Sequence, residues 1–430
     1  MRLQKNDVIT LDDGRIVVED LLGEGGQGEV YLVDHDGRKY ALKVYKDEQS
    51  DDFRYNLQNN IKRGAPSGDF LWPRQLIDFE DGRIGYLMDL RPKNYVSFVS
   101  YLTGKTPFAG RALLLRWCIR LCEAFKMLHE RGYSYQDLND GSFFLDPATG
   151  DLLICDNDNV TADKKNLGVL GKMRYMAPEI VREEQMPDIH SDRFSLAIIL
   201  FMALCLGSPY EGERLKQYDL VDEKTEYELY GSKPLFIYHK TDRSNRPIRG
   251  YHTSVLRRWP TLPIYIKEAF HRTFVDGLAD RENERTTELE WLRLLSAYRD
   301  ELATCPACGY EYVYGFEEKQ VTTACPACGK PVRALCCLTV GRHRVALEPG
   351  KKLFAPLLDK YSSQYDREIG RVIASKQNPA RWGIRLDTGT EVLIRDAVGT
   401  EKTIAADGVI PIVQDLTIQF NDNLKGEISK

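Results

Sequence analysis

A glycine-rich turn between two apolar runs places the strongest constraint on how the start of this chain can fold. The stretch LGEGGQGEVYLV spaces Gly23, Gly25 and Gly28 as GxGxxG and continues into the β-prone run EVYLV. In a dinucleotide-binding fold the same spacing leads from a strand into a helix, whereas here it leads into a second strand. The stretch is therefore either a plain β-hairpin or a hairpin that covers a nucleotide.

The spacing of apolar residues predicts a small β-rich lobe followed by a mostly helical one. From about residue 8 to 90, short β-prone runs alternate with Gly and Asp turns, and only the polar segment 51–63 is typical of a helix. Helical spacing recurs in three later segments, 111–131, 192–206 and 286–303. The stretch 208–262 is polar, without a clear period and long for a loop, so we expect short helices or a docking insertion there. The predicted fold class is therefore α+β.

Length and composition indicate an ordinary globular protein. The 430 residues allow about three domains, and 43% hydrophobic and 29% charged residues exclude a disordered or fibrous chain. A net charge of -5 gives no global attraction to nucleic acid or to an anionic membrane. The N-terminal stretch MRLQKNDVITLDDG lacks the apolar core of a signal peptide, and the longest apolar run, 195–207, is too short to span a membrane. We therefore expect a soluble, cytoplasmic protein.

A lysine and two acidic motifs follow the glycine-rich turn. Lys43 lies on the apolar strand ALKVY, 15 residues after Gly28. The motif YQDLNDGS then contains Asp137, and the motif CDND contains Asp156. Three further motifs come later in the chain: MAPE, SDRFSLAII and ENERTTELEWL. In this order the motifs resemble those of the protein kinase family.

The resemblance implies a bilobal protein-kinase fold and a role for each motif. Asp137 would accept the proton of the substrate hydroxyl, Asp156 would hold Mg²⁺ or Mn²⁺, and Lys43 would contact the α- and β-phosphates of ATP. Arg285 would pair with Glu179 in the helical lobe. The implied ATP-binding residues are Gly23, Glu24, Gly25, Gly26, Gly28, Val30, Ala41, Lys43, Met88, Asp89 and Leu90.

Three positions around Asp137 depart from the usual kinase pattern. Tyr135 and Gln136 replace a His and an Arg. Because that Arg normally neutralises a phosphorylated loop, loop phosphorylation is not expected to be the switch here. Ser142 occupies the position of an Asn that ligates a second metal ion, and its hydroxyl can still ligate Mg²⁺.

Further departures change the charges near the site. Asn157 and Asp158 replace Phe and Gly, and we hypothesise that Asp158 adds a carboxylate to the Mg²⁺ site. Asn139 stands where kinases usually have a Lys, while Lys172 stands where they usually have a Thr. We hypothesise that Lys172 supplies the missing cation as a catalytic group. The alternative is that Lys172 is a solvated loop charge.

The sequence leaves the partner of Lys43 open. The segment FRYNLQNNIKRG places Asn56 where kinases carry a glutamate, so Lys43 would gain a hydrogen bond without an ion pair, or would engage Asp156 until a nucleotide binds. The missing glutamate favours a nucleotide-binding pseudokinase scaffold. The retained Lys43, Asp137 and Asp156 favour an active serine/threonine kinase. Both interpretations stand at this point.

Two CPACG motifs predict a structural Zn²⁺ site. Each motif places two thiols on one tight turn, and the 16 residues between them are typical of a β-hairpin. The predicted ligands are Cys305, Cys308, Cys325 and Cys328. A redox-active dithiol is the alternative. Acidic and basic residues balance around the motifs, so we expect a structural or protein-docking role and no nucleic-acid binding.

The chain from about residue 338 carries short β-prone runs between turns, which predicts a small all-β sandwich or barrel. Its run beginning IGRVIASK faintly resembles forkhead-associated domains, which bind phosphothreonine. That family has a Ser and a His after its Gly-Arg; Ser375 is present, but no His follows His343. Phosphopeptide binding through Arg371 is one interpretation, and a plain protein-contact domain is the other. The predicted domains are a kinase N-lobe (1–90), a kinase C-lobe (91–300), a zinc ribbon (301–335) and the β-rich domain (336–430).

The altered acidic loops, the motif FLWPRQLIDFEDGRIGYLMDL and the C-terminal zinc module together resemble bacterial kinases of the TerY phosphorylation triad. The resemblance implies a role in bacterial signalling or stress response. It also implies a von Willebrand A-domain protein as partner or substrate, and a metal-dependent phosphatase as the reversing enzyme.

Overall fold

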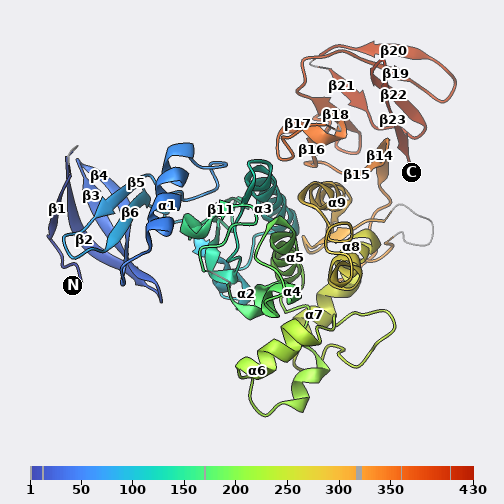
Figure 1. Cartoon of the computed structure of the whole chain (residues 1–430). Helices are drawn as coiled ribbons and strands as arrows, with labels where there is room; N and C mark the ends of the chain where they lie inside the picture. The colour runs from blue at the N-terminus through green and yellow to red at the C-terminus, as the bar shows by residue number, and fades with distance from the viewer. Residues whose placement is uncertain (1, 12–13, 169–170, 316–321, 360, 407) are drawn as a thin grey trace. The chain divides into compact units, whose positions relative to one another are not determined.

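The chain forms two compact units in the computed structural model, which describes residues 2–11, 14–168, 171–315, 322–359, 361–406 and 408–430 (Figure 1). The first unit comprises Met1–Pro107, Ala124–Val255 and Phe270–Thr287. The second comprises Phe108–Glu123, Leu256–Ala269 and Glu288–Lys430. The long helix α3 (Arg111–Glu130) therefore contributes residues to both units.

The first unit begins with a six-stranded antiparallel sheet in the order β1-β2-β3-β4-β6-β5. Its strands are β1 (Val8–Leu11), β2 (Gly14–Glu24), β3 (Gly28–His35), β4 (Arg38–Tyr45), β5 (Gln75–Asp78) and β6 (Ile84–Asp89). Alternate side chains share one face of the sheet and form an apolar core that includes Ile16, Val33 and Leu42. The β-prone runs predicted for this lobe are thus confirmed as strands of one sheet.

Helix α1 (Asp51–Arg63) lies between β4 and β5 in sequence and forms where the polar segment predicted a helix. The Ser50 side chain caps it by accepting a hydrogen bond from the N–H of Phe53. Acidic residues in its first turn and basic residues in its last turn complement the helix dipole. Its buried face carries two amides, Asn56 and Asn60, beside apolar side chains.

Helix α5 (Ile189–Cys205) is the main buried helix of the first unit. Every residue from Phe194 to Cys205 is buried, and a capping box between Asp188 and Ser191 begins the helix. A helix that is apolar all round belongs in a protein core, which confirms the interpretation of the run 195–207. Among the residues that the structure describes, none of the helices is both long and apolar enough to cross a membrane.

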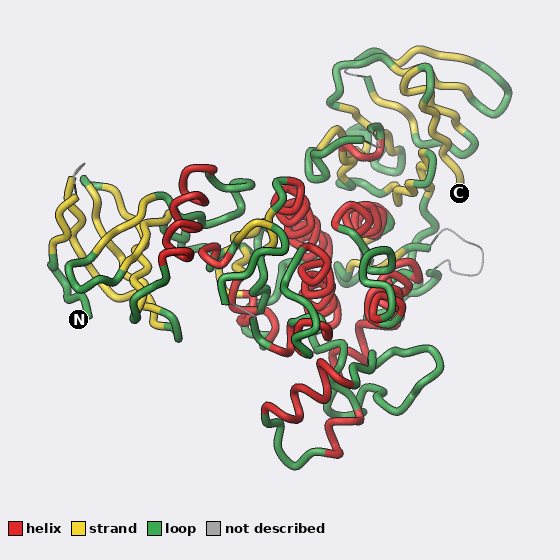
Figure 2. The backbone as a smooth tube through the Cα atoms, viewed as in Figure 1, coloured by secondary structure: helices red, strands yellow, loops and turns green. Residues whose placement is uncertain are grey.

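The other elements that follow the sheet are short. They are β7 (Val96–Ser97), α2 (Phe98–Leu102), β8 (Tyr133–Ser134), β9 (Phe143–Leu145), β10 (Leu152–Ile154), β11 (Thr161–Ala162), α4 (Pro178–Val181), α6 (Glu223–Glu226), a π-helix (Tyr227–Ser232), α7 (Thr253–Arg258) and α8 (Ile264–Phe274). The polar stretch 208–262 therefore holds short helices, as predicted (Figure 2).

The second unit ends in a domain built from two sheets around one core. The six-stranded sheet has the order β15-β14-β23-β22-β19-β20 and the four-stranded sheet the order β16-β17-β18-β21. The strands are β14 (Cys336–Val340), β15 (His343–Leu347), β16 (Lys352–Phe354), β17 (Glu368–Ala374), β18 (Trp382–Leu386), β19 (Val392–Arg395), β20 (Glu401–Ile404), β21 (Val409–Pro411), β22 (Leu416–Asn421) and β23 (Leu424–Ser429). Buried aliphatic residues of both sheets, such as Leu338, Ile384 and Ile418, form this core. The all-β domain lies where the sequence predicts it.

Charged contacts connect this domain to helices within the second unit. Asp366, in the loop before β17, is 2.5 Å from Arg116 of α3 and 3.4 Å from Arg299 of α9 (Glu288–Asp300). Arg299 also donates to the carbonyl oxygen of Tyr365 at 2.8 Å. The β-rich domain is therefore packed on α9 and the start of α3.

Candidate functional site

The glycine-rich turn forms the tip of the β2–β3 hairpin. The N–H of Gly25 donates to the carbonyl oxygen of Gly28 at 2.9 Å, which closes the turn. A side chain at Gly28 would lie 2.5 Å from the carbonyl oxygen of Val44, so glycine is required there. Three further predicted nucleotide-binding residues are exposed at this tip: Gly23, Glu24 and Gly26. The tip carries little side-chain bulk, as expected of a turn that lies over phosphates.

Lys43 lies on β4 with its side chain buried against two carboxylates. Its Nζ atom is 2.8 Å from Asp158 Oδ2 and 3.5 Å from Asp156 Oδ1. The hydroxyl of Tyr45 also donates to Asp158 Oδ2. Burial by itself lowers the pKa of Lys43, but the carboxylates outweigh it and raise this pKa above its usual value. Burial likewise raises the pKa of Asp158, but Lys43 and Tyr45 more than offset it, so this pKa lies below its usual value.

The acidic loop after β10 exposes one of its carboxylates and buries the other. Asp156 has a left-handed backbone, with φ 55° and ψ 46°, and its side chain is 53% exposed. The amide of Asn157 anchors the loop by donating to the carbonyl oxygens of Leu71 at 2.9 Å and Ile154 at 3.0 Å. The side chain of Asp158 has no exposed surface. Of the two predicted metal ligands in this loop, Asp156 is therefore the one open to solvent.

The predicted catalytic residues Asp137 and Lys172 come together through Asn139. Lys172 Nζ donates to Asn139 Oδ1 at 3.0 Å, and Asn139 Nδ2 donates to Asp137 Oδ1 at 3.1 Å. Gly171 allows this approach, because a side chain there would lie 3.3 Å from Asp137 Oδ1. Burial raises the pKa of Asp137, although Asn139 and Lys172 oppose the shift, and a raised pKa suits a proton acceptor. Ser142 is fully buried and its hydroxyl donates to the Asp137 carbonyl at 3.4 Å, so Mg²⁺ would have to gain access to a buried hydroxyl oxygen to bind there.

Asp192, on α5, holds the backbone of the catalytic loop. Its carboxylate accepts hydrogen bonds from the N–H groups of Tyr135 and Gln136, and lies 3.1 Å from His129 Nε2. The sequence motif around Asp192 predicts its helix but not this role, because its partners lie 56 to 63 residues away. An Asp in the first turn of a helix whose later turns are almost wholly apolar is the signal that could have found it.

Neutral side chains hold the segments on either side of the site. Gln136 Nε2 donates to the carbonyl oxygen of Lys165, and Gln136 Oε1 accepts from the amide of Asn166 at 3.1 Å. On α1, Asn56 and Asn60 both donate to the carbonyl oxygen of Val160, at 2.8 Å and 2.7 Å. These contacts fix the segment after the acidic loop without ion pairs.

Apolar residues of the sheet and of the β9–β10 hairpin pack beside Lys43. The predicted nucleotide-binding residues on the sheet are Val30, Ala41, Met88, Asp89 and Leu90, and Ala41 lies opposite Met88 in the β4–β6 register. Ala41 and Met88 belong to one buried cluster, against which Val30, Leu90 and Leu153 pack while partly exposed. Leu153 comes from β10, so the cluster joins the sheet to the acidic loop's own hairpin. A partly exposed apolar patch beside a cation suits a nucleobase and its phosphates.

The predicted ion pair between Glu179 and Arg285 is confirmed. The guanidinium group of Arg285 donates to both carboxylate oxygens of Glu179 at 2.7 Å. Arg285 is 1% exposed and Glu179 is 8% exposed. This is a bidentate pair inside the helical part of the first unit.

The four predicted Zn²⁺ ligands lie together in the second unit. Their sulfur atoms are all within 4.8 Å of one another, with Sγ of Cys305 3.8 Å from Cys328 and Sγ of Cys308 3.7 Å from Cys325. Zinc at about 2.3 Å from each sulfur of a tetrahedron sets the sulfurs roughly 3.8 Å apart, so the four residues fit Zn²⁺. Strand β13 (Glu311–Val313) pairs with β12 (Leu302–Thr304), and the middle of the predicted hairpin, 316–321, lies outside the described residues.

Arg371, the predicted phosphopeptide contact, lies on an exposed row of cations. Cross-strand register sets it between Lys352 of β16 and Arg385 of β18. Glu368 pairs with both Lys352 and Arg371 and so neutralises part of this charge. Phosphopeptide binding by this domain stays a prediction.

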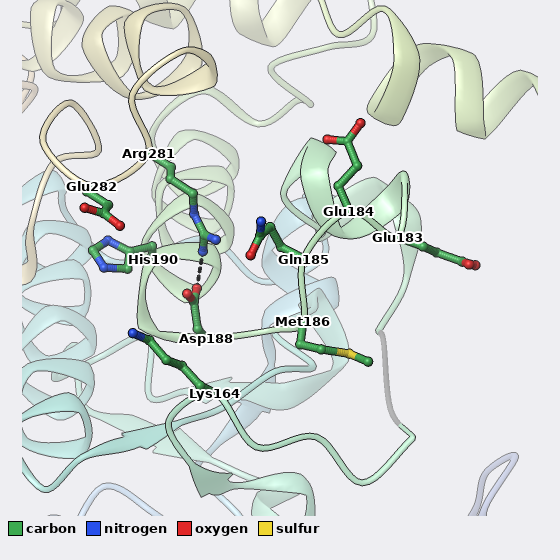
Figure 3. A pocket seen from close by; sticks show the side chains of 9 residues that line it. All are labelled: Lys164, Glu183, Glu184, Gln185, Met186, Asp188, His190, Arg281 and Glu282. Carbon is green, nitrogen blue, oxygen red and sulfur yellow. Dashed lines mark hydrogen bonds and ion pairs between the residues drawn. The ribbon is translucent and has the colours of Figure 1, made fainter.

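A separate surface cavity of about 750 Å³ lies in the first unit (Figure 3). Its lining residues are Lys164, Glu183, Glu184, Gln185, Met186, Asp188, His190, Arg281 and Glu282. Figure 3 shows Arg281 paired with Asp188, the residue that caps α5. None of these residues is among the predicted catalytic or nucleotide-binding residues.

Comparison with known proteins agrees with this geometry. Residues 75–274 match the family model described as protein kinase domain. The chain is 25% identical over 216 residues to serine/threonine-protein kinase sck2 of Schizosaccharomyces pombe, an alignment of 46% of this chain and 32% of that protein. It is 29% identical over 224 residues to human ribosomal protein S6 kinase alpha-4, with 46% and 28% covered. It is 25% identical over 215 residues to serine/threonine-protein kinase pkn2 of Myxococcus xanthus, with 46% and 25% covered.

The chain thus spans about a third or less of the length of these relatives. The matched region includes both acidic motifs and the buried helix α5. Residues 75–274, of mixed helix and sheet content, are thus similar to the protein kinase domain, and the chain resembles serine/threonine kinases over this part of its length.

Proposed function

We propose that the chain is an ATP- and Mg²⁺-dependent protein kinase that transfers the γ-phosphoryl group of ATP to a serine or threonine of a partner protein. The observation that supports this best is the convergence of three groups that the chemistry needs. Lys43 Nζ is 3.5 Å from Asp156 Oδ1, and the charge of Asp156 contributes to raising the pKa of Asp137. Lys43 lies 94 residues before Asp137 in the sequence, and Asp156 follows Asp137 by 19 residues.

Each group has one task in the proposed reaction. Lys43 contacts the α- and β-phosphates, while the apolar cluster around Ala41 and Met88 takes the adenine ring. Asp137 accepts the proton of the attacking hydroxyl, and Lys172 brings positive charge to the transferred group. Mg²⁺ held by carboxylate oxygens such as those of Asp156 would neutralise the charge that develops on the phosphoryl oxygens.

A nucleotide-binding pseudokinase is the second candidate, and one observation favours it. Lys43 is 6% exposed and already paired with Asp158, while Asn56 leaves α1 without the usual glutamate. Incubation with γ-labelled ATP, Mg²⁺ or Mn²⁺ and candidate partner proteins separates the two. Label transfer that Asp137→Ala abolishes, with ATP binding retained, supports the kinase. ATP binding without transfer of label to any protein supports the pseudokinase. A chain that neither binds ATP nor transfers label would exclude both functions.

The wider setting rests on the resemblance to kinases of the TerY triad. On that basis we propose action in bacterial signalling, with a von Willebrand A-domain protein as partner or substrate and a metal-dependent phosphatase as the reversing enzyme. The zinc ribbon and the β-rich domain would dock the partner. Co-purification of a von Willebrand A-domain protein with the full chain, but not with a variant lacking residues 301–430, tests the docking role.

A further inference from the structure

Lys43 and Asp158 form a buried ion pair that the sequence does not lead one to expect. Their Nζ and Oδ2 atoms are 2.8 Å apart, and Asp158 is fully buried. Burying a carboxylate is costly unless a cation and hydrogen-bond donors compensate for lost water. Lys43 provides the cation, and the hydroxyl of Tyr45 provides a second donor to the same oxygen. The buried carboxylate of Asp158 is thus compensated by a cation and a hydrogen bond.

In protein kinases the corresponding lysine pairs with a glutamate on a mobile helix, and that pair has to form for activity. Helix α1 of this chain, DDFRYNLQNNIKR, contains no glutamate. The residue at the expected position, Asn56, donates its amide to the carbonyl oxygen of Val160. Asn60, one turn later, donates to the same oxygen. Helix α1 is therefore attached to the segment after the acidic loop and supplies no carboxylate to Lys43.

We propose that Asp158 is the positioning residue that holds Lys43 for its contact with the phosphates, in place of a helix glutamate. The proposal rests on the proposed kinase function for its consequence, since a positioned lysine matters only if a nucleotide binds. Asp158 lies two residues after Asp156, so one short loop sets both the lysine and the exposed metal-binding carboxylate.

Binding of Mg²⁺ by Asp158 is the competing role. The buried Oδ1 atom of Asp158 has no hydrogen-bond partner among the described residues, so a metal ion could reach it only after the loop opens. Asp156, by contrast, is 53% exposed and needs no such opening. The two roles predict different behaviour when each Asp is changed to Asn.

The first test needs no nucleotide. Melting temperatures are compared for the wild type, Asp158→Asn, Lys43→Met and the double variant. Asp158→Asn leaves the buried Lys43 with only its longer contact to Asp156, so we expect a fall in melting temperature of at least about 5 °C, most of which adding Lys43→Met restores. The same set of variants with Asp156→Asn in place of Asp158→Asn is the matched control. Its falls in melting temperature should be additive, since the contact between Lys43 and Asp156 is longer and Asp156 is exposed. If the falls in melting temperature for Lys43→Met and Asp158→Asn were additive in the double variant, the two side chains would not be coupled and the proposal would fail.

The second test follows label transfer to a partner protein as Mg²⁺ is varied. We expect Asp158→Asn to lower kcat about 10- to 100-fold at saturating Mg²⁺, with the half-saturating Mg²⁺ concentration unchanged. Asp156→Asn should raise that concentration. If added Mg²⁺ restored the rate of Asp158→Asn, this residue would be a metal ligand and the proposal would fail. A wild type that transfers no phosphate would refute the kinase function alone, because the melting cycle still tests the pair.

Discussion

Replacing Arg285 with methionine should destabilise the first unit strongly, because it leaves a buried carboxylate without its main partner. Arg285 donates two 2.7 Å hydrogen bonds to Glu179 and two more to the carbonyl oxygens of Gly277 and His190. Breaking a buried pair by removing one partner costs about 3–5 kcal/mol. Arg281, 3.4 Å from Glu179, remains as a second cation, so we expect the lower part of that range. For a unit of this size the melting temperature should fall by roughly 6–16 °C.

The assay is thermal unfolding followed by circular dichroism. Arg281→Met is the matched control: its side chain is more exposed, and we expect less than half the effect. The double variant Glu179→Gln/Arg285→Met should melt above Arg285→Met, since no charge is left buried. A fall of less than about 3 °C for Arg285→Met would refute the reasoning, because it would mean that the buried carboxylate needs no partner.

The pH dependence of the same pair has a defined sign. Burial raises the pKa of Glu179, but Arg285 more than offsets this and lowers it below the usual value of 4.5. A folded-state pKa below the unfolded one gives stability that is present above the unfolded pKa and is lost as the pH falls through the folded one. The difference in melting temperature between wild type and Arg285→Met should therefore shrink below about pH 4.5.

Three further predictions address the metal site and the catalytic loop. Elemental analysis of the full chain should find one Zn²⁺. The variant Cys305→Ser should lose this ion, and the melting temperature of the second unit should fall. An unchanged metal content in this variant would exclude the four-cysteine site. Asp137→Asn should lower kcat at least about 100-fold with little change in ATP binding, and an equal loss of both would argue against its role as proton acceptor. Lys172→Ala should lower kcat about 10- to 100-fold, with partial recovery in Asn139→Lys/Lys172→Ala, whereas full turnover in Lys172→Ala would show a solvated loop charge.

Local patterns in the sequence were sufficient to predict the strands and helices on which the site residues lie. Alternating apolar runs predict the strands around Lys43, and helical spacing predicts α1 and α5. Motif order places Asp137 and Asp156 on loops next to short strands, and both lie there. The ion pair of Glu179 and Arg285 also follows from motif order, since both residues belong to motifs named from the sequence.

Contacts between segments distant in sequence were not predictable in the same way. The sequence predicts that Asp158 contributes to a metal site, whereas in the structure it meets Lys43, 115 residues away. Tyr45 lies two residues from Lys43 on the same strand face, so the sequence could have predicted that both side chains point toward the same region. It could not have predicted that the Tyr45 hydroxyl donates to Asp158. A pattern states which face a side chain takes, while the choice of partner depends on how separate segments pack.

Two charged residues that protein kinases use near the active site, a catalytic-loop arginine and a helix glutamate, are replaced here by neutral side chains. Gln136 holds residues 165–166 by neutral hydrogen bonds where an arginine would await a phosphorylated loop. Two asparagines of α1 bind a backbone carbonyl where a glutamate would bind the lysine, and Lys43 finds its carboxylate within the acidic loop. Each neutral hydrogen bond contributes about 0.5–1.5 kcal/mol and, unlike a pair of exposed charges, is not screened by salt. In the described residues, the contacts that hold these groups therefore involve neither a phosphorylated residue nor a charged side chain of α1.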